Sequence, residues 1–280
     1  MDFFVFVAVL IAAVMHAGWN AVVKVGLDRT SSILLLSLVQ SGLALVLMPF
    51  FPMPAAAAWP WLAASALLHT GYKLFLIRAY EHGDLSQVYP LARGAAPLMV
   101  AVVGALVLGE SMTLIKAFAV IAIALGVVVM SLKGSADLGR LPPKALGYAL
   151  ATSVFIAAYS LVDGVGARIS LTASGFVLWM FVLDGLVMLA YGFATRGRSA
   201  LARLVPAWRE GVLAGALSLG AYWIVVWAFT QAPIALVVAL RETSVLFAML
   251  IAVFMLHEKA GRWRWAAAAL IVGGVVLIRV

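Results

Sequence analysis

The chain contains no cysteine, and only 11% of its 280 residues carry a charge. The absence of cysteine excludes disulfides, thiolate metal ligands and a cysteine nucleophile. The scarcity of charge excludes a water-soluble globular domain, in which about 25% of the residues are charged. The chain is instead 66% hydrophobic, with a mean hydropathy of +1.14. This composition is typical of an integral membrane protein.

Ten apolar runs follow one another along the chain, each near the roughly 20 residues that a membrane-spanning helix needs. They lack the alternating pattern of a membrane β-barrel, so we predict an all-α integral membrane fold with ten transmembrane helices. No basic segment precedes the first run, so we expect this run to be retained rather than cleaved as a signal peptide. The connections are too short for a soluble domain. The runs cover residues 3–23, 32–51, 59–80, 85–108, 114–132, 145–165, 173–194, 211–230, 234–256 and 263–278.

The two halves of the chain match each other weakly but in order. The stretch GWNAVVKVG (18–26) matches AYSLVDGVG (158–166), and later stretches match at a similar spacing. We therefore predict two five-helix repeats, residues 1–134 and 144–280, within one membrane domain. Because five is an odd number of crossings, the second repeat begins on the opposite side of the membrane. This arrangement gives inverted repeats related by an axis in the membrane plane.

An arginine interrupts an apolar run at the same place in each repeat. Arg93 and Arg241 each lie 17 residues before a glutamate, Glu110 and Glu258 respectively. A charged side chain costs about 2.5–3.5 kcal/mol at a helix centre, so both guanidinium groups should face the protein interior rather than lipid. Because the two helices enter from opposite faces, we expect both arginines to approach a common layer near the middle of the membrane.

Two interpretations of these arginines are open. In the first, they form structural ion pairs with acids in neighbouring helices. In the second, they bind a carboxylate or phosphate of a substrate, which their matched positions favour, because inverted-repeat carriers place substrate sites near the midplane. The acids within reach are Glu242 beside Arg241, and Asp184, Asp163 and Glu81 for Arg93.

Other polar and aromatic residues occur at helical spacing inside the predicted helices. His16 and Asn20 lie four residues apart on one helix face, and the matching Tyr159 and Ser160 again pair an aromatic with a polar side chain. Such residues either line a cavity or make hydrogen bonds between helices. The three intramembrane acids Glu242, Asp184 and Asp163 are candidates for proton coupling or for ion pairs. The candidate substrate-binding residues are His16, Trp19, Asn20, Tyr72, Lys73, Tyr89, Arg93, Tyr159, Tyr222, Trp223 and Arg241.

Several short motifs recur with the duplication: HAGWNAVVK (16–24), YPLARGAAP (89–97), and the GE and HE pairs that end at Glu110 and Glu258. With the count of ten helices, their order and spacing resemble the EamA-type branch of the drug/metabolite transporter (DMT) superfamily, over nearly the whole chain. The resemblance implies transport of a small molecule across the inner membrane by alternating access, often the export of amino acids or other metabolites. It also implies a central cavity lined by helices 1, 3, 4, 6, 8 and 9.

We therefore predict a secondary transporter that exports a small zwitterionic or carboxylate metabolite. Exchange or import of organic or phosphorylated anions, and drug export, are alternatives, and an intramembrane enzyme is the alternative of a different class. The stretch HEKAG (257–261) is not the zinc-binding H-E-x-x-H, and GVGARI (164–169) is not a phosphate-binding loop. No metal, cofactor or catalytic residue is expected. The expected partners are a small-molecule substrate, the lipid bilayer and, as candidate coupling ion, the proton, but no nucleic acid.

The basic residues are distributed unequally between the two ends of the predicted helices. Of the 19 lysines and arginines, 13 fall in or beside connections 1, 3, 5, 7 and 9, and three fall on the other side together with the termini. Basic residues in short loops favour the cytoplasmic side. We therefore predict that both termini face the periplasm, although several relatives are described with cytoplasmic termini.

Overall fold

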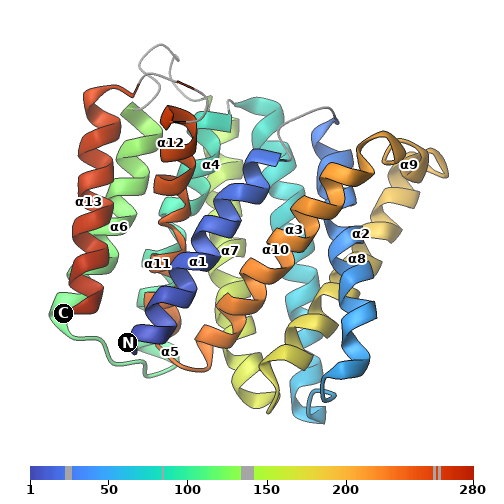
Figure 1. The fold of residues 1–280 in the computed structure, drawn as a ribbon, viewed down its shortest axis with the longest axis horizontal. Helices are drawn as coiled ribbons and strands as arrows, with labels where there is room; N and C mark the ends of the chain where they lie inside the picture. Colours follow the sequence, from blue (N-terminus) through green and yellow to red (C-terminus); the bar gives the residue numbers. More distant parts are fainter. Residues whose placement is uncertain (23–26, 84, 134–141, 255–256, 258–259) are drawn as a thin grey trace.

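The computed structural model describes residues 1–22, 27–83, 85–133, 142–254, 257 and 260–280. Over these residues the chain forms helices and no strands, which confirms the all-α prediction (Figure 1). The α-helices are α1 (Phe3–Val22), α2 (Arg29–Leu47), α3 (Trp59–His82), α4 (Leu85–Gly94), α5 (Ala96–Val107), α6 (Leu114–Lys133), α7 (Pro143–Ile169), α8 (Ala173–Arg196), α9 (Ser199–Ala202), α10 (Trp208–Phe229), α11 (Ile234–Arg241), α12 (Ser244–Phe254) and α13 (Arg262–Arg279). Short 3-10 helices are η1 (Met48–Phe50), η2 (Ala56–Ala58) and η3 (Val205–Ala207).

Proline and a capping threonine fix where several helices begin. Pro60, Pro97 and Pro143 lie in the first turns of α3, α5 and α7, where the missing N–H leaves no helical hydrogen bond unmade. The Thr172 side chain accepts a hydrogen bond from the Gly175 N–H at the start of α8. The connection after α8 contains α9 and η3, two short elements that the sequence analysis did not predict.

The fourth and ninth predicted helices are each broken in two, where the sequence analysis predicted continuous helices over 85–108 and 234–256. The first break separates α4 from α5, and Pro97 explains it because proline cannot donate the backbone hydrogen bond that would continue α4. The second break separates α11 from α12. There the Thr243 hydroxyl donates to the Leu240 carbonyl at 2.7 Å, which competes with regular helical bonding.

By length and hydropathy, six helical stretches of the described residues are suited to crossing a membrane. Two further apolar helices, Leu91–Val107 and Leu114–Met130, are shorter. Polar residues interrupt α3, and three arginines lie within α13. A multi-pass membrane protein is thereby confirmed, and the number of ten crossings stays a prediction. The six stretches are Phe3–Asn20, Arg29–Phe50, Pro143–Ile169, Ala173–Arg196, Ser199–Phe229 and Ile234–Phe254.

Helices from the two halves of the chain pack on each other reciprocally. α3 packs on α7 and α8, and its counterpart α10 packs on α1 and α2. In the pair formed by α6 and α13, a Cβ added to Gly126 would lie 2.6 Å from Ile271, and a Cβ added to Gly274 would lie 2.6 Å from Ile123. Only glycine therefore permits this close approach of the two helices. A two-fold relation between the repeats would produce such reciprocal contacts.

The outer surface of the bundle is apolar. Leu106 is 81% exposed, Leu67 65% and Phe118 63%, whereas several charged side chains are buried inside. This distribution is the reverse of that in a water-soluble protein and suits a bundle surrounded by lipid. Both chain ends lie at the same end of the bundle (Figure 1).

Candidate functional site

A cluster of charged side chains lies buried among the helices. Burial of an ion in a low-dielectric interior is costly unless it is paired, so each of these groups requires a partner or a function. Both helix breaks adjoin the cluster, since Arg93 lies next to the end of α4 and Arg241 and Glu242 lie where α11 ends. The cluster consists of Lys73, Arg93, Asp163, Asp184, Arg241 and Glu242, each less than 10% exposed.

Arg93 pairs with Glu242 across the two halves of the chain. Its Nε lies 2.6 Å from Glu242 Oε2 and its Nη2 lies 3.0 Å from Oε1, which makes a two-point guanidinium–carboxylate contact. Its Nη1 lies 2.7 Å from His16 Nε2 on α1. The partner of Arg93 is thus not one of the acids Asp184, Asp163 and Glu81 that the sequence analysis considered.

Arg241 lies on the other side of the same carboxylate. Its Nη2 is 3.5 Å from Glu242 Oε1, an ion-pair distance, but neither Nη2 nor Nε makes a hydrogen bond. The guanidinium carbon lies 5.9 Å from the centre of the Tyr159 ring. The two arginines at matched repeat positions therefore meet at one carboxylate, and Arg241 retains donors that are buried and unused. A buried donor without a protein partner is rare and requires an explanation, such as a bound ligand, ion or water.

Asp163 on α7 forms a second part of the cluster. Its Oδ2 lies 2.9 Å from His69 Nε2 and also accepts a hydrogen bond from the Tyr222 hydroxyl, whereas its Oδ1 has no partner. The His69 ring stacks on Tyr159 at 4.0 Å between ring centres. The sequence places His69 within one helical turn of Tyr72 and Lys73 and so makes it a cavity candidate, although the list of candidate binding residues does not include it.

Lys73 and Asp184 form a third part. The Lys73 ammonium contacts Asp184 Oδ2 and lies 2.8 Å from the Ser37 hydroxyl, which joins α3, α8 and α2. Lys73 is therefore held inside the bundle and does not extend its charge to the membrane surface. Asp184 Oδ1 has no hydrogen-bond partner.

The remaining candidates divide between this cluster and other contacts. Trp19 donates its indole N–H to His16 Nδ1 at 3.2 Å, and Tyr72 meets the Tyr159 ring edge-on at 5.7 Å. The Asn20 amide is bonded to the backbone carbonyl of His16. Trp223 lies apart from the buried charges: it donates to Ser174 Oγ at 2.9 Å and packs on Phe51. The Tyr89 side chain and Glu258 lie outside the described residues.

A network of hydrogen bonds connects helix ends at the end of the bundle where the chain termini lie. The Glu110 carboxylate accepts hydrogen bonds from Arg168 at 2.7 Å and from the Ile234 N–H, which starts α11, at 2.9 Å. Arg168 also donates to the backbone carbonyls of Phe229 and Ala232. Glu110, singled out by its place in the repeats, thus ties the connection after α5 to the connection before α11.

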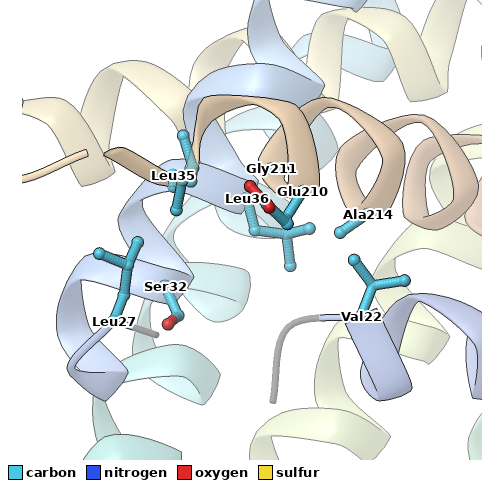
Figure 2. A pocket seen from close by; sticks show the side chains of 9 residues that line it. Val22, Leu27, Ser32, Leu35, Leu36, Glu210, Gly211 and Ala214 are labelled. Carbon is cyan, nitrogen blue, oxygen red and sulfur yellow. The ribbon is translucent and has the colours of Figure 1, made fainter. Parts of the chain in front are cut away.

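An apolar pocket lies at the opposite end of α1, between α1, α2 and α10 (Figure 2). Its cavity volume is only about 20 Å³. Leucine, valine and alanine side chains form most of its wall, and Glu210 at its rim is exposed. This lining supplies no buried group for a charged ligand, so the candidate site is the charged cluster rather than this pocket.

The arrangement of the cluster suits the binding of a small charged molecule. The unused N–H groups of Arg241 can donate hydrogen bonds to a carboxylate, and the Tyr159, Tyr222 and Tyr72 rings around them supply apolar surface. In the part of the chain that the structure describes, no group of three or more histidine or acidic side chains is placed to hold a metal ion.

Comparisons with known proteins identify the fold and the family of the chain. A solved structure described only as a crystal structure of a protein has the same fold, with a TM-score of 0.73, 17% sequence identity, and coverage of 99% of this chain and 96% of its own. None of the curated proteins compared with the chain matches it. The model of the EamA-like transporter family matches residues 3–132 and 143–280, one stretch in each predicted repeat. The chain therefore belongs to the EamA-like transporter family, within the drug/metabolite transporter superfamily.

Proposed function

We propose that the chain is a secondary carrier that exports a small carboxylate or zwitterion by alternating access. The observation that carries this proposal is the buried Arg241 guanidinium, whose Nε and Nη2 have no hydrogen-bond partner among the residues that the structure describes. Arg93, by contrast, already binds Glu242 at two points. A guanidinium with two free donors in a dry interior favours an anion with paired oxygens, such as a carboxylate.

Two features of the fold support a carrier. Substrate sites in inverted-repeat carriers lie near the membrane midplane and are typically formed by discontinuous helices. Here both broken helices, α4–α5 and α11–α12, contribute to the charged cluster, and they occupy matching places in the two halves of the chain. The reciprocal packing of α6 and α13 at Gly126 and Gly274 further supports an inverted two-fold relation between the repeats.

The side chains around Arg241 limit the classes of substrate that the site could bind. The Tyr159 ring lies beside the guanidinium and can support an apolar portion of the ligand. Phosphorylated anions would use the same donors, so they are the nearest alternative. The family relation favours transport over an intramembrane enzyme, because the family's members are described as transporters.

A binding experiment tests the proposal directly. Purified protein is heated with amino acids, organic acids, organic phosphates and amines, and a compound that binds the folded state alone raises the apparent melting temperature. We expect stabilisation by carboxylates or zwitterions in the wild type and none in Arg241→Gln. Arg198→Gln, which changes an exposed arginine, is the matched control.

Flux measurements complete the test. A stabilising compound should cross the membrane of liposomes that contain the wild-type protein and should be recovered chemically unchanged. Stabilisation by amines alone would overturn the carboxylate proposal, and conversion of the compound to a product would favour an enzyme.

A further inference from the structure

We propose that Asp163, held by His69 and Tyr222, is the residue that carries the proton coupled to transport. This inference rests on the proposed function, because a coupled proton is meaningful only in a carrier. The sequence alone offered three buried acids as candidates for proton coupling, and this proposal selects one of them. The selection depends on which side chains surround each acid.

Glu242 is matched by permanent positive charge. Arg93 donates to both of its carboxylate oxygens, and Arg241 lies 3.5 Å from one of them. Arginine does not lose its proton in proteins. Protonation of Glu242 would break two charge-assisted hydrogen bonds and leave two guanidinium groups buried without a counterion, so Glu242 is poorly suited to taking up a proton.

Asp184 is also paired with a cationic side chain. Its Oδ2 contacts the Lys73 ammonium, which the Ser37 hydroxyl also binds. Protonation of Asp184 would leave the ammonium buried and unpaired. The pair is therefore stable as an ion pair, and its role is to join α3 to α8.

Among the three acids, Asp163 is the one whose described hydrogen-bond partners are a histidine and a tyrosine rather than a lysine or an arginine. His69 Nε2 lies 2.9 Å from its Oδ2, and the Tyr222 hydroxyl donates to the same oxygen. The side chain is fully buried, and Oδ1 has no partner. A carboxylate in such a site is penalised by burial when it is ionised, and a proton on Oδ1 removes that charge without breaking either hydrogen bond.

Two of the cations on the helices that pack against α7 are paired with other acids, whereas Arg241 keeps donors that no described residue uses. Arg93 on α4 binds Glu242, Lys73 on α3 binds Asp184, and Arg241 on α11 lies over the Tyr159 ring. The described parts of α5 and η2 carry no titratable side chain. The titratable groups that contact Asp163 are His69 of α3 and Tyr222 of α10, with Tyr159 of α7 stacked on His69 and Arg241 of α11 over the Tyr159 ring. On the neighbouring helices, Lys73 pairs with Asp184 and Arg93 pairs with Glu242.

His69 and Tyr222 also provide a route for the proton. Histidine exchanges protons near neutral pH, and Tyr222 is only partly buried. Either partner can give its hydrogen-bonded proton to Oδ2 and then take up another proton, and rotation of the neutral carboxyl group places the added proton on the second oxygen and restores the hydrogen bond. A carrier that exchanges this proton for substrate would use an inward proton gradient to drive export.

Infrared spectroscopy of the purified protein tests the proton site without a substrate. The probe is the proton itself, observed through the C=O stretch of a protonated carboxylic acid as the pH is lowered from alkaline to acidic. We expect a titrating band in the wild type that is absent from Asp163→Asn and present in Asp184→Asn and Glu242→Gln. A wild type without such a band, or a band that persists in Asp163→Asn, would overturn the proposal.

A second variant covers the case in which Asp163→Asn does not fold. Tyr222→Phe removes one hydrogen-bond donor to Asp163 Oδ2, so the band should remain but move to a higher C=O stretching frequency. An unchanged band frequency in Tyr222→Phe would contradict the assignment to Asp163.

Transport measurements separate this inference from the proposed function. Liposomes that contain the protein and a trapped pH-sensitive dye are given an outward gradient of mixed amino acids, and separately of succinate. Proton movement should accompany solute efflux in the wild type and be lost in Asp163→Asn. Efflux without proton movement in the wild type would overturn the coupling role and leave the carrier proposal intact. The absence of any solute efflux would count against the carrier, while the infrared band would still report on Asp163.

Discussion

The Arg93 guanidinium and the Glu242 carboxylate form a two-point contact at 2.6 and 3.0 Å, although the residues lie 149 positions apart. The contact joins the end of α4 in the first half of the chain to the end of α11 in the second. Both side chains are almost completely buried. The pair therefore connects the two broken helices at the centre of the charged cluster.

The first prediction concerns this pair. Arg93→Met leaves Glu242 with only the more distant Arg241, and Glu242→Met leaves both arginines without a counterion. Removal of one partner of a buried pair costs about 3–5 kcal/mol, so both single variants should be destabilised, Glu242→Met more strongly. The double variant still leaves Arg241 without Glu242, so it should lose less stability than the sum of the two single variants without reaching the wild-type value. Thermal unfolding in one detergent measures all four proteins, and simple addition of the two single effects would argue against the coupling.

The second prediction concerns the crossing of α6 and α13. Gly126→Ala and Gly274→Ala place a methyl group against Ile271 and Ile123 and against nearby backbone atoms. Such overpacking costs about 1–3 kcal/mol, so both variants should unfold at lower temperature. Gly273→Ala is the matched control, because a Cβ there meets no atom within 4 Å. Equal stability of all three variants would refute the close contact.

The third prediction concerns acid stability at the start of α2. Asp28 accepts hydrogen bonds from Arg196 at 2.8 and 3.0 Å, and this contact, followed by smaller contributions that include hydrogen bonds from Ser31, holds the pKa of Asp28 well below its usual value. A lowered pKa means that the folded state favours the ionised carboxylate. The stabilisation is therefore present above the unfolded pKa of about 3.9 and is lost as the pH falls below it.

The measurement compares melting temperatures of the wild type and Arg196→Gln at neutral and at acidic pH. The Asp28 side chain is 47% exposed, so the neutral-pH difference should not exceed about 1 kcal/mol. We expect the difference in stability between the wild type and Arg196→Gln to become smaller as the pH falls below the pKa of Asp28 in the unfolded chain. Arg198→Gln should show no such pH dependence, and a difference for Arg196→Gln that grew in acid would contradict the sign.

The fourth prediction concerns orientation. Because basic residues concentrate beside the odd-numbered connections, both termini should face the periplasm. A periplasm-dependent phosphatase fused after Val280 should be active, and a cytoplasm-dependent fluorescent tag at the same position should not fluoresce. A fluorescent fusion without phosphatase activity would reverse the orientation.

The sequence by itself determined the membrane class, the helical content and the matched positions of Arg93 and Arg241. These properties depend on hydropathy, composition and spacing, which are read along the chain. Sequence reasoning also singled out Asp163, Asp184 and Glu242, because acids are rare inside apolar runs.

Only the tertiary structure decided which oppositely charged side chains form pairs. Arg93 binds Glu242 rather than the three acids considered for it, Lys73 binds Asp184, and His69 joins Asp163. The break between α11 and α12 was not predicted either, because no proline lies at that point of the sequence. Partner choice depends on the rotation and crossing of helices that are distant in the sequence, and packing of whole helices sets these quantities. Residue spacing within one helix fixes only the face on which a side chain lies, so it could not distinguish a paired arginine from Arg241, whose donors remain unused.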